Sequence, residues 1–172
     1  MGFINPRRIL SEQLRLESRM VAADFGCGSG EWVIPLAEAL ENGKVYAIDL
    51  LEEPLSALRG KARVKNLQNI EIVKSDVEKT ISRLLAKSLD LVLVTNLLFQ
   101  IEKRKEVFDE AKRVLKSGGK LLVVDWNESA QIGPAQKIPA KDLKELAQNS
   151  GFSLESEFEA GNFHIGLVFT KK

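Results

Sequence analysis

Five short, nearly continuous apolar runs alternate with amphipathic segments along most of the chain. The runs lie at residues 20–25, 44–49, 70–76, 89–96 and 120–126. Strands that are buried on both faces have this pattern, and helical segments between them are typical of right-handed βαβ units. Helices are therefore expected at residues 31–41, 52–66, 78–87 and 102–116, with the glycines of KSGGK ending the last one. The alternation predicts an α/β fold built on a parallel sheet.

The pattern changes after residue 126. A polar loop with glycine and proline follows at 127–139, and then a helical segment at 140–150. Two strand-like segments, 152–160 and 164–172, are joined by so short a link that they are predicted to form an antiparallel hairpin.

The first 19 residues predict a helical segment that precedes this core. Pro6 is placed at the start of an amphipathic helix, because proline is favoured at the first helical position. One side of that helix is expected to carry Ile9, Leu10, Gln13 and Leu14. The segment either covers the cofactor, with Phe3 and Ile4 bordering the acceptor site, or only packs on the sheet. No repeat or linker is visible, so we expect a single domain over 1–172, with the helical segment at 1–19 and the core at 20–172.

The segment VAADFGCGSG places three glycines at the first strand-to-helix turn. Gly26, Gly28 and Gly30 let the chain turn sharply and let a ligand approach the backbone closely. The G-x-G-x-G spacing differs from the G-x-G-x-x-G of dinucleotide enzymes. Asp24 would repel a pyrophosphate but attract an ammonium or sulfonium group. S-adenosylmethionine carries both cations, together with a carboxylate that suits the N–H groups opening the next helix.

Two further acids are expected at the ends of the second and third strands. A carboxylate at Asp49 is placed to accept hydrogen bonds from ribose hydroxyls, a feature shared with NAD enzymes. Asp76 either accepts from an adenine amino group, with Val77 adding a backbone contact, or caps the helix that follows. Leu50 is placed to cover one adenine face. Parallel strands end at one edge of a sheet, so these groups are predicted to converge on one crevice.

These motifs resemble those of class I S-adenosylmethionine-dependent methyltransferases, especially small members of the ubiquinone/menaquinone-biosynthesis type. VAADFGCGSG is similar to the first motif of that family, VYAIDL to the second, SDVE to the third and LDLVLVTNLLFQI to the fourth. AKRVLKSGGKLLVVDW resembles the helix, turn and strand that follow. The resemblance covers about residues 20–170. It implies a Rossmann-like, doubly wound sheet of seven strands in the order 3-2-1-4-5-7-6, with strand 7 antiparallel.

The resemblance also implies how the cofactor, S-adenosylmethionine, would lie. Its methionine end would contact the first motif, its ribose the second and its adenine the third. The residues implied by position are Asp24, Gly26, Cys27 and Gly28 for the methionine end, Asp49 for ribose, and Asp76 and Val77 for adenine. Asn96 would lie near the methionine moiety and the acceptor. It occurs in TNLLFQ rather than in the N-P-P-[YF] pattern of enzymes that methylate amino groups of adenine or glutamine, which disfavours those acceptors.

Three residues at strand ends are candidates for the acceptor side: Asn96, Asp125 and His164. The single histidine has an unperturbed pKa of about 6.5, which suits proton transfer, but a half-buried histidine with a backbone partner is an equally open interpretation. Asp125 either acts on the acceptor or stabilises the loop after its strand. Trp126 either stacks on the acceptor or packs under that loop. The loop 127–139 is either a lid or a plain connection.

Composition excludes several classes of protein. The chain has 25 basic and 24 acidic residues, so its charge gives no reason to expect nucleic acid as a partner. Cys27 is the only cysteine, which rules out a disulfide framework. No stretch approaches the roughly 20 apolar residues of a membrane span, and the start lacks a signal-peptide core, so we expect a cytoplasmic protein without a membrane partner.

The sequence therefore predicts an S-adenosylmethionine-dependent methyltransferase with an unidentified small-molecule substrate and no metal. A general base is optional in this chemistry, and a homodimer is left open as a source of further cover for the site. Two alternatives stay open. An NAD(P)-dependent oxidoreductase would share Asp49 but lacks the third glycine in register, and Tyr46, the only tyrosine, lies inside the second strand. A non-catalytic subunit would bind the cofactor without turnover.

Overall fold

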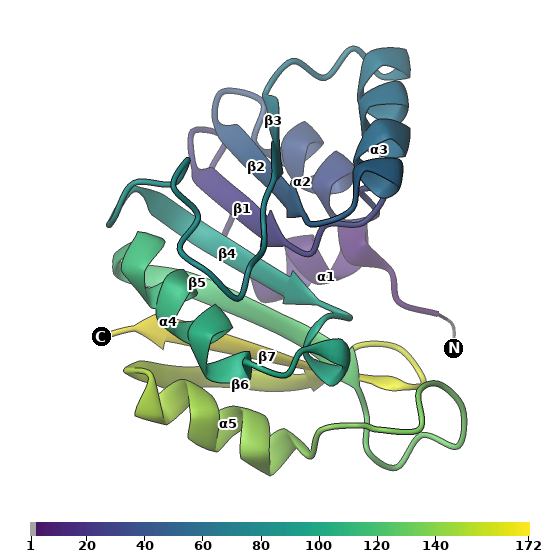
Figure 1. The fold of residues 1–172 in the computed structure, drawn as a ribbon, viewed down its shortest axis with the longest axis vertical. Helices are drawn as coiled ribbons and strands as arrows, with labels where there is room; N and C mark the ends of the chain where they lie inside the picture. The colour runs from purple at the N-terminus through teal and green to yellow at the C-terminus, as the bar shows by residue number, and fades with distance from the viewer. Residues whose placement is uncertain (1–2) are drawn as a thin grey trace.

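A computed structural model describes residues 3–172, in which seven strands form one mixed sheet in the order β3-β2-β1-β4-β5-β7-β6 (Figure 1). The strands are β1 (Val21–Phe25), β2 (Lys44–Asp49), β3 (Ile70–Lys74), β4 (Leu89–Thr95), β5 (Leu115–Trp126), β6 (Phe152–Glu159) and β7 (His164–Lys171). The first five strands pair in parallel, and β7 runs antiparallel between β5 and β6. The predicted fold class, strand order and hairpin are confirmed.

Helices cover both faces of this sheet. They are α1 (Pro6–Gln13), α2 (Val33–Ala39), α3 (Glu52–Val64), the short 3-10 helix η1 (Leu98–Gln100), α4 (Arg104–Val114) and α5 (Ala140–Asn149). The first three pack on one face, and α4 and α5 pack on the other (Figure 1). Side chains alternate along a strand, so β1 sends Ala23 to the core under α4 and Ala22 to the core under α2. Asp24 consequently lies on the same face as α1, α2 and α3.

The ends of two helices show what sequence patterns capture. As predicted, α1 begins at Pro6, and the side chain of Asn5 accepts a hydrogen bond from the backbone N–H of Arg8 at 3.1 Å. The predicted glycine stop after α4 is wrong, because β5 begins directly at residue 115. Lys171 donates to the carbonyls of Lys112 and Leu115, at 2.6 Å each, and so satisfies the end of α4 in place of a glycine cap. None of the helices in residues 3–172 is long and apolar enough to cross a membrane.

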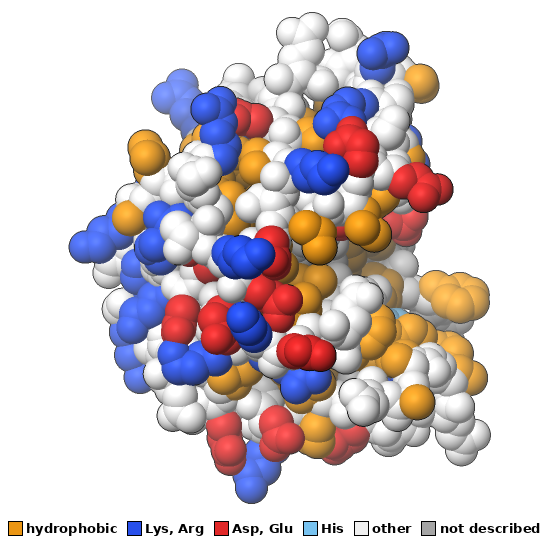
Figure 2. Space-filling model, viewed as in Figure 1, with side chains coloured by type: hydrophobic (Ala, Val, Ile, Leu, Met, Phe, Trp, Pro, Cys, Tyr) orange, Lys and Arg blue, Asp and Glu red, His pale blue; other side chains and the backbone are white. Residues whose placement is uncertain are grey.

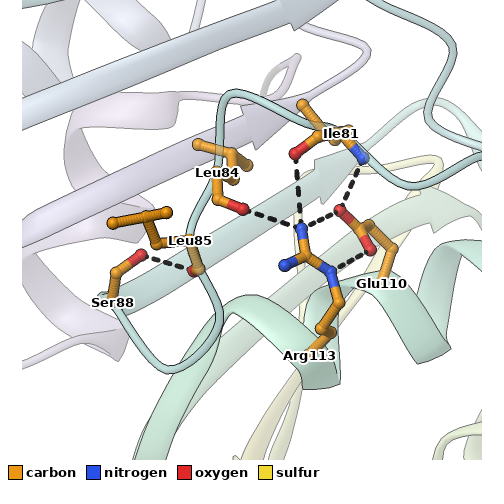
Figure 3. Close-up of polar contacts among 6 residues, drawn as sticks. All are labelled: Ile81, Leu84, Leu85, Ser88, Glu110 and Arg113. Atoms are coloured by element: carbon orange, nitrogen blue, oxygen red, sulfur yellow. Dashed lines mark hydrogen bonds and ion pairs between the residues drawn. The ribbon is translucent and has the colours of Figure 1, made fainter.

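The predicted helix at 78–87 is also wrong, because that segment forms a series of turns. Side chains of α4 hydrogen-bond to its backbone (Figure 3), and within the segment the N–H of Leu84 donates to the carbonyl of Ile81 at 2.9 Å. Glu110 accepts from the N–H of Ile81 at 2.8 Å, and Arg113 donates to the carbonyl of Leu84 at 2.9 Å. Glu110 and Arg113 also pair with each other through two hydrogen bonds. Long-range side-chain partners thus override the local helical pattern.

Glu110→Ala is expected to lower the free energy of unfolding by about 2–4 kcal/mol, because it leaves the N–H of Ile81 without its acceptor and the Arg113 guanidinium without its carboxylate partner. Urea unfolding measures this change. Asp109→Ala on the same helix is the control, since Asp109 is exposed and, within residues 3–172, pairs only with Lys105, and it is expected to change stability by less than about 0.5 kcal/mol. Equal losses in the two variants would contradict the role of Glu110.

Candidate functional site

A cavity of about 650 Å³ opens at the edge of the sheet where the parallel strands end. It lies where the strand order reverses between β1 and β4, which is where ligands bind in open α/β sheets. The predicted residues that line it are Gly26, Cys27, Gly28, Asp49, Leu50, Asp76, Val77 and Asn96. Four predicted residues do not line this cavity, namely Asp24, Gly30, Asp125 and His164.

The three glycines of the first turn differ in what surrounds them. All have positive φ angles, at 74° for Gly26, 52° for Gly28 and 89° for Gly30. A Cβ atom on Gly26 would lie 2.7 Å from Leu97, and one on Gly30 would lie 2.3 Å from Leu58. At Gly28 such an atom would meet nothing within 4 Å. The outer two glycines are thus required by protein packing, whereas the middle one faces open space in the cavity.

Asp49 closes the glycine turn from the neighbouring strand. One carboxylate oxygen accepts from the N–H of Gly28 at 2.9 Å, and the other accepts from the N–H of Leu51 at 3.0 Å. A carboxylate has about four acceptor positions, so positions remain for ligand hydroxyls. Leu50 and Leu51 lie beside it with exposed fractions of 57% and 62%. This corner of the cavity therefore combines a fixed acceptor with apolar surface.

Asp24 is completely buried, and neither of its carboxylate oxygens has a hydrogen-bond partner among the described residues. Burial, and after it the negative charge of Asp49, raises the pKa of Asp24 well above its usual value. A cationic group placed next to it would supply the missing partner and favour the ionised form. The same surroundings raise the pKa of the buried Cys27 thiol, so this cysteine is not a thiolate nucleophile.

Asp76 lies at the cavity wall after β3. One oxygen accepts from the N–H of Glu78 at 3.0 Å, and the other is 3.1 Å from the ammonium of Lys79. The backbone hydrogen bond and then Lys79 lower the pKa of Asp76. It caps a turn rather than a helix, and it presents an ionised acceptor beside Val77.

Asn96 ends β4 in the left-handed conformation, with φ of 51°. Its N–H donates to the carbonyl of Val124 at 2.8 Å, which holds the end of β4 against β5. Its side-chain oxygen is buried and has no partner among the described residues. This oxygen and the Asp24 carboxylate are thus two buried acceptors left for a ligand beside the glycine turn.

Asp125 is fully buried, and both of its oxygens are bonded to backbone groups. They accept from the N–H of Leu98 at 2.9 Å and from the N–H of Trp126 at 2.8 Å. Burial raises the pKa of Asp125 despite these hydrogen bonds. The side chain joins β5 to η1, whose residue Gln100 lines the cavity. Its contacts hold the wall of the cavity.

His164 begins β7 and pairs with Trp126 at the end of the β5–β7 ladder. Their rings lie 4.2 Å apart, centre to centre, with a tilt of 39°. The Nε2 atom of His164 is enclosed and has no partner among residues 3–172. Burial lowers the pKa of His164 below its usual value, so the imidazole is neutral near pH 7.

Several lining residues were not predicted from the sequence. They are Pro6, Ser29, Glu31, Trp32, Leu51, Pro54, Ser75, Glu78, Thr95, Leu97, Gln100 and Ile101, whereas Ile4, which was expected to border the acceptor site, also lines the cavity. Glu31 and Trp32 directly follow the glycine turn, so their position in the chain is the one signal that points to them. Lys61 of α3 also reaches this turn and donates to the carbonyl of Ser29 at 3.0 Å. The sequence near either residue does not predict this contact. No cluster of metal-binding side chains was found among the described residues.

Known proteins resemble this chain over most of its length. Residues 16–157 match the model of a family described as a methyltransferase domain. Demethylmenaquinone methyltransferase of Oceanobacillus iheyensis is 28% identical over 182 residues, a match that covers 96% of this chain and 76% of that protein. The Bacillus cereus protein of the same name is 30% identical over 113 residues, which cover 65% of this chain and 47% of the relative. The chain thus matches about half the length of that relative.

A solved structure shares both the fold and part of the sequence. The crystal structure of a SAM dependent methyltransferase from Aquifex aeolicus superimposes with a TM-score of 0.89 and 26% sequence identity. The superposition covers 99% of this chain and 91% of that one.

Proposed function

Because the chain belongs to the class I S-adenosylmethionine-dependent methyltransferases, we propose that it transfers a methyl group from S-adenosylmethionine to a small molecule of the quinone-related class. The observation that carries the proposal is the buried Asp24 carboxylate, whose oxygens have no hydrogen-bond partner among the described residues. Asp24 directly precedes the glycine turn that lines the cavity. The names of the Oceanobacillus and Bacillus relatives support a quinone-related ring as acceptor.

The residues around the cavity fit each part of this cofactor. Asp24 would take the ammonium group of the methionine end, because its two oxygens lack donors. Asp49 would accept the ribose hydroxyls with its remaining acceptor positions. Asp76 would accept from the adenine amino group, and Leu50 would cover the ring. The open space at Gly28 would admit the ligand next to the backbone.

The protein's task in this chemistry is to align the acceptor and exclude water. When bound, S-adenosylmethionine supplies a methyl group that its sulfonium already activates. The unpartnered side-chain oxygen of Asn96 orients groups at the methionine end. Asp125 keeps η1 in place and so fixes the wall along which an acceptor approaches. None of these roles needs a residue that removes a proton before transfer.

Isothermal titration calorimetry with S-adenosylhomocysteine and with NADH separates this proposal from an oxidoreductase. S-adenosylhomocysteine is expected to bind, and NADH is not, because Asp24 disfavours a pyrophosphate at the glycine turn. Tritium transfer from methyl-labelled S-adenosylmethionine to 1,4-dihydroxynaphthalene, kept reduced, then tests turnover. Tight binding of S-adenosylhomocysteine without transfer to any of a panel of reduced quinones would favour the non-catalytic alternative.

Asp49→Ala is expected to weaken S-adenosylhomocysteine binding by about 10-fold, because it removes the acceptor for two ribose hydroxyls and the partner of the Gly28 N–H. The same calorimetric titration measures the change. Glu53→Ala is the control, since Glu53 is an exposed acid at the start of the adjacent helix and does not line the cavity. Unchanged affinity in Asp49→Ala would contradict the proposed position of the ribose.

A further inference from the structure

The indole of Trp126 and the imidazole of His164 pack against each other at the end of β5, and neither side chain lines the cofactor cavity. Trp126 and His164 are paired residues at the last rung of the β5–β7 ladder, and their rings are 4.2 Å apart. Both lie on the sheet face that carries α1, because they continue the alternation of Val124 and Val168.

Their position follows from the order of the strands. In the proposed binding mode, adenine lies over β3 and the methionine end over β1 and β4, so the next strand in the sheet, β5, lies beyond the reacting end. Thr95, at the end of β4, pairs with Val124 of β5. Trp126 comes two residues after Val124, which places it about 7 Å further toward the carboxyl ends of the parallel strands. Asp125 ties the backbone of Trp126 to that of Leu98, next to the cavity wall. The ring pair therefore stands on the side from which an acceptor must come.

The imidazole has an unused polar atom. Nε2 of His164 is enclosed, with no hydrogen-bond partner among the described residues. A buried polar atom without a partner costs about 1–3 kcal/mol, and folded proteins hold few of them. A neutral imidazole can accept a hydrogen bond from a hydroxyl group, and the buried surroundings of His164 keep it neutral. A hydroxyl group on a ligand would supply the missing partner.

The loop between β5 and α5 covers the indole with a glycine. A Cβ atom on Gly133 would lie 2.4 Å from the Trp126 ring, so only a glycine fits there. Within the described chain, residues 131–137 make no hydrogen bond, whereas Asn127 is tied to Phe163 by one of 2.8 Å. Ile138 is buried again at the far end. The tip of the loop is thus held by its contact with the indole, and such weakly bonded segments open readily.

Exposed apolar side chains occur on this loop and on the N-terminal segment. Ile132 on the loop is 48% exposed, and Phe3 at the N-terminal segment is 88% exposed. Figure 2 shows hydrophobic side chains gathered along the edge of the molecule at which Figure 1 draws the loop between β5 and α5. An apolar approach that ends in an indole and one unpartnered imidazole nitrogen suits a ligand that is a flat apolar ring with a single polar group.

We propose that Trp126 and His164 form the acceptor subsite, that the acceptor is a planar aromatic ring bearing a hydroxyl group, and that residues 131–137 close over it. The ring packs against the indole and its hydroxyl donates to the imidazole. The inference rests on the proposed function, because it places this subsite beside the methyl group that the cofactor presents.

The test uses protein saturated with S-adenosylhomocysteine and two probes, 2-naphthol and 2-methylnaphthalene, which differ in having a hydroxyl or a methyl group. The wild type is expected to bind 2-naphthol about 10-fold more tightly, the effect of one buried hydrogen bond. Because His164 is the only histidine, its imidazole ¹⁵N resonances are unambiguous, and they are expected to shift with 2-naphthol alone. Amide hydrogen exchange of residues 131–137 is expected to slow in the same complex.

Two variants separate the parts of the subsite. His164→Phe is expected to bind both probes equally, whereas Trp126→Leu is expected to weaken both by about 10-fold. Both variants should keep the wild-type affinity for S-adenosylhomocysteine, since neither side chain lines the cofactor cavity.

Three results would overturn the inference in distinguishable ways. If S-adenosylhomocysteine binds but the two probes bind alike and the imidazole resonances stay fixed, the subsite is wrong while the proposed function stands. If the probes are discriminated but exchange of residues 131–137 is unchanged, the closing of the loop is wrong. If S-adenosylhomocysteine itself fails to bind, the proposed function fails and the subsite fails with it.

Discussion

Replacing Asp24 with asparagine is expected to weaken S-adenosylhomocysteine binding by about 100-fold while making the ligand-free protein more stable at pH 8. The loss of affinity follows because a charge-assisted hydrogen bond to the ammonium group, made in a fully buried place, is exchanged for a neutral one. The gain in stability, about 1–2 kcal/mol, follows because the variant no longer buries an unpaired carboxylate. A single substitution thus changes binding and stability in opposite directions.

The raised pKa of Asp24 also predicts how the stability of the protein changes with pH. Burial raises the pKa of Asp24 in the folded protein, so the folded state keeps this proton over a pH range in which the unfolded chain has released it. This group's contribution to stability therefore falls as the pH rises from the unfolded pKa of about 3.9 through the raised value. Thermal or urea unfolding between pH 4 and 8 measures this slope, which is expected to be shallower in Asp24→Asn.

Asp90→Asn is the matched control for Asp24→Asn. Asp90 also lies in a central strand, β4, but its carboxylate accepts from the N–H of Val21 at 2.8 Å and from Lys116 at 2.6 Å, at the opposite end of the strands from the cavity. Its replacement is expected to cost stability and to leave S-adenosylhomocysteine affinity unchanged. If Asp24→Asn behaved in the same way, Asp24 would be a structural acid and the position assigned to the ammonium group would be wrong.

The parts of the fold that the sequence predicted are those whose cause is local. Short apolar runs predicted all five parallel strands, and the short link before His164 predicted the hairpin. The segment 78–87 has a helical pattern of apolar residues, but Glu110 and Arg113 bind its backbone from a helix that comes later in the chain. No pattern within a segment reveals a partner about thirty residues away.

In the candidate site as well, the sequence predicted the features that have a local cause and missed those that depend on distant segments. Residues at or just after the end of a strand, such as Asp49 and Asp76, line the cavity because the topology brings strand ends together. The sequence placed Asp125 at that edge as well, but it did not reveal that both carboxylate oxygens are bonded to backbone N–H groups, one of them on the segment after the neighbouring strand. Strand position determines the edge that a residue reaches, whereas the hydrogen-bond partners there depend on loops from other strands.

The glycines of the first turn offer a paired experiment in which two similar substitutions have different consequences. Gly28→Ala is expected to weaken S-adenosylhomocysteine binding by about 100-fold, because the new methyl group enters the open space that the ligand would occupy. Its cost to stability is expected to be only about 1 kcal/mol, the strain of a left-handed alanine, since a Cβ atom meets nothing within 4 Å.

Gly30→Ala is expected to do the reverse and to lower the free energy of unfolding by about 3 kcal/mol. Its Cβ atom would lie 2.3 Å from a methyl group of Leu58, which is completely buried and cannot withdraw, and φ at this position is 89°. Gly30 does not line the cavity, so the folded fraction of this variant is expected to bind S-adenosylhomocysteine within about 3-fold of the wild type.

Urea unfolding and calorimetry on both glycine variants decide whether the turn serves the ligand or only the fold. Wild-type affinity in Gly28→Ala would mean that the cofactor does not approach the backbone at the middle glycine, and the proposed binding mode would have to be abandoned. A loss of stability at Gly28 as large as that at Gly30 would mean that the space beside Gly28 is filled in solution. The expected pattern, with binding lost at one glycine and stability lost at the other, requires a turn whose outer glycines pack against the protein and whose middle glycine meets the ligand.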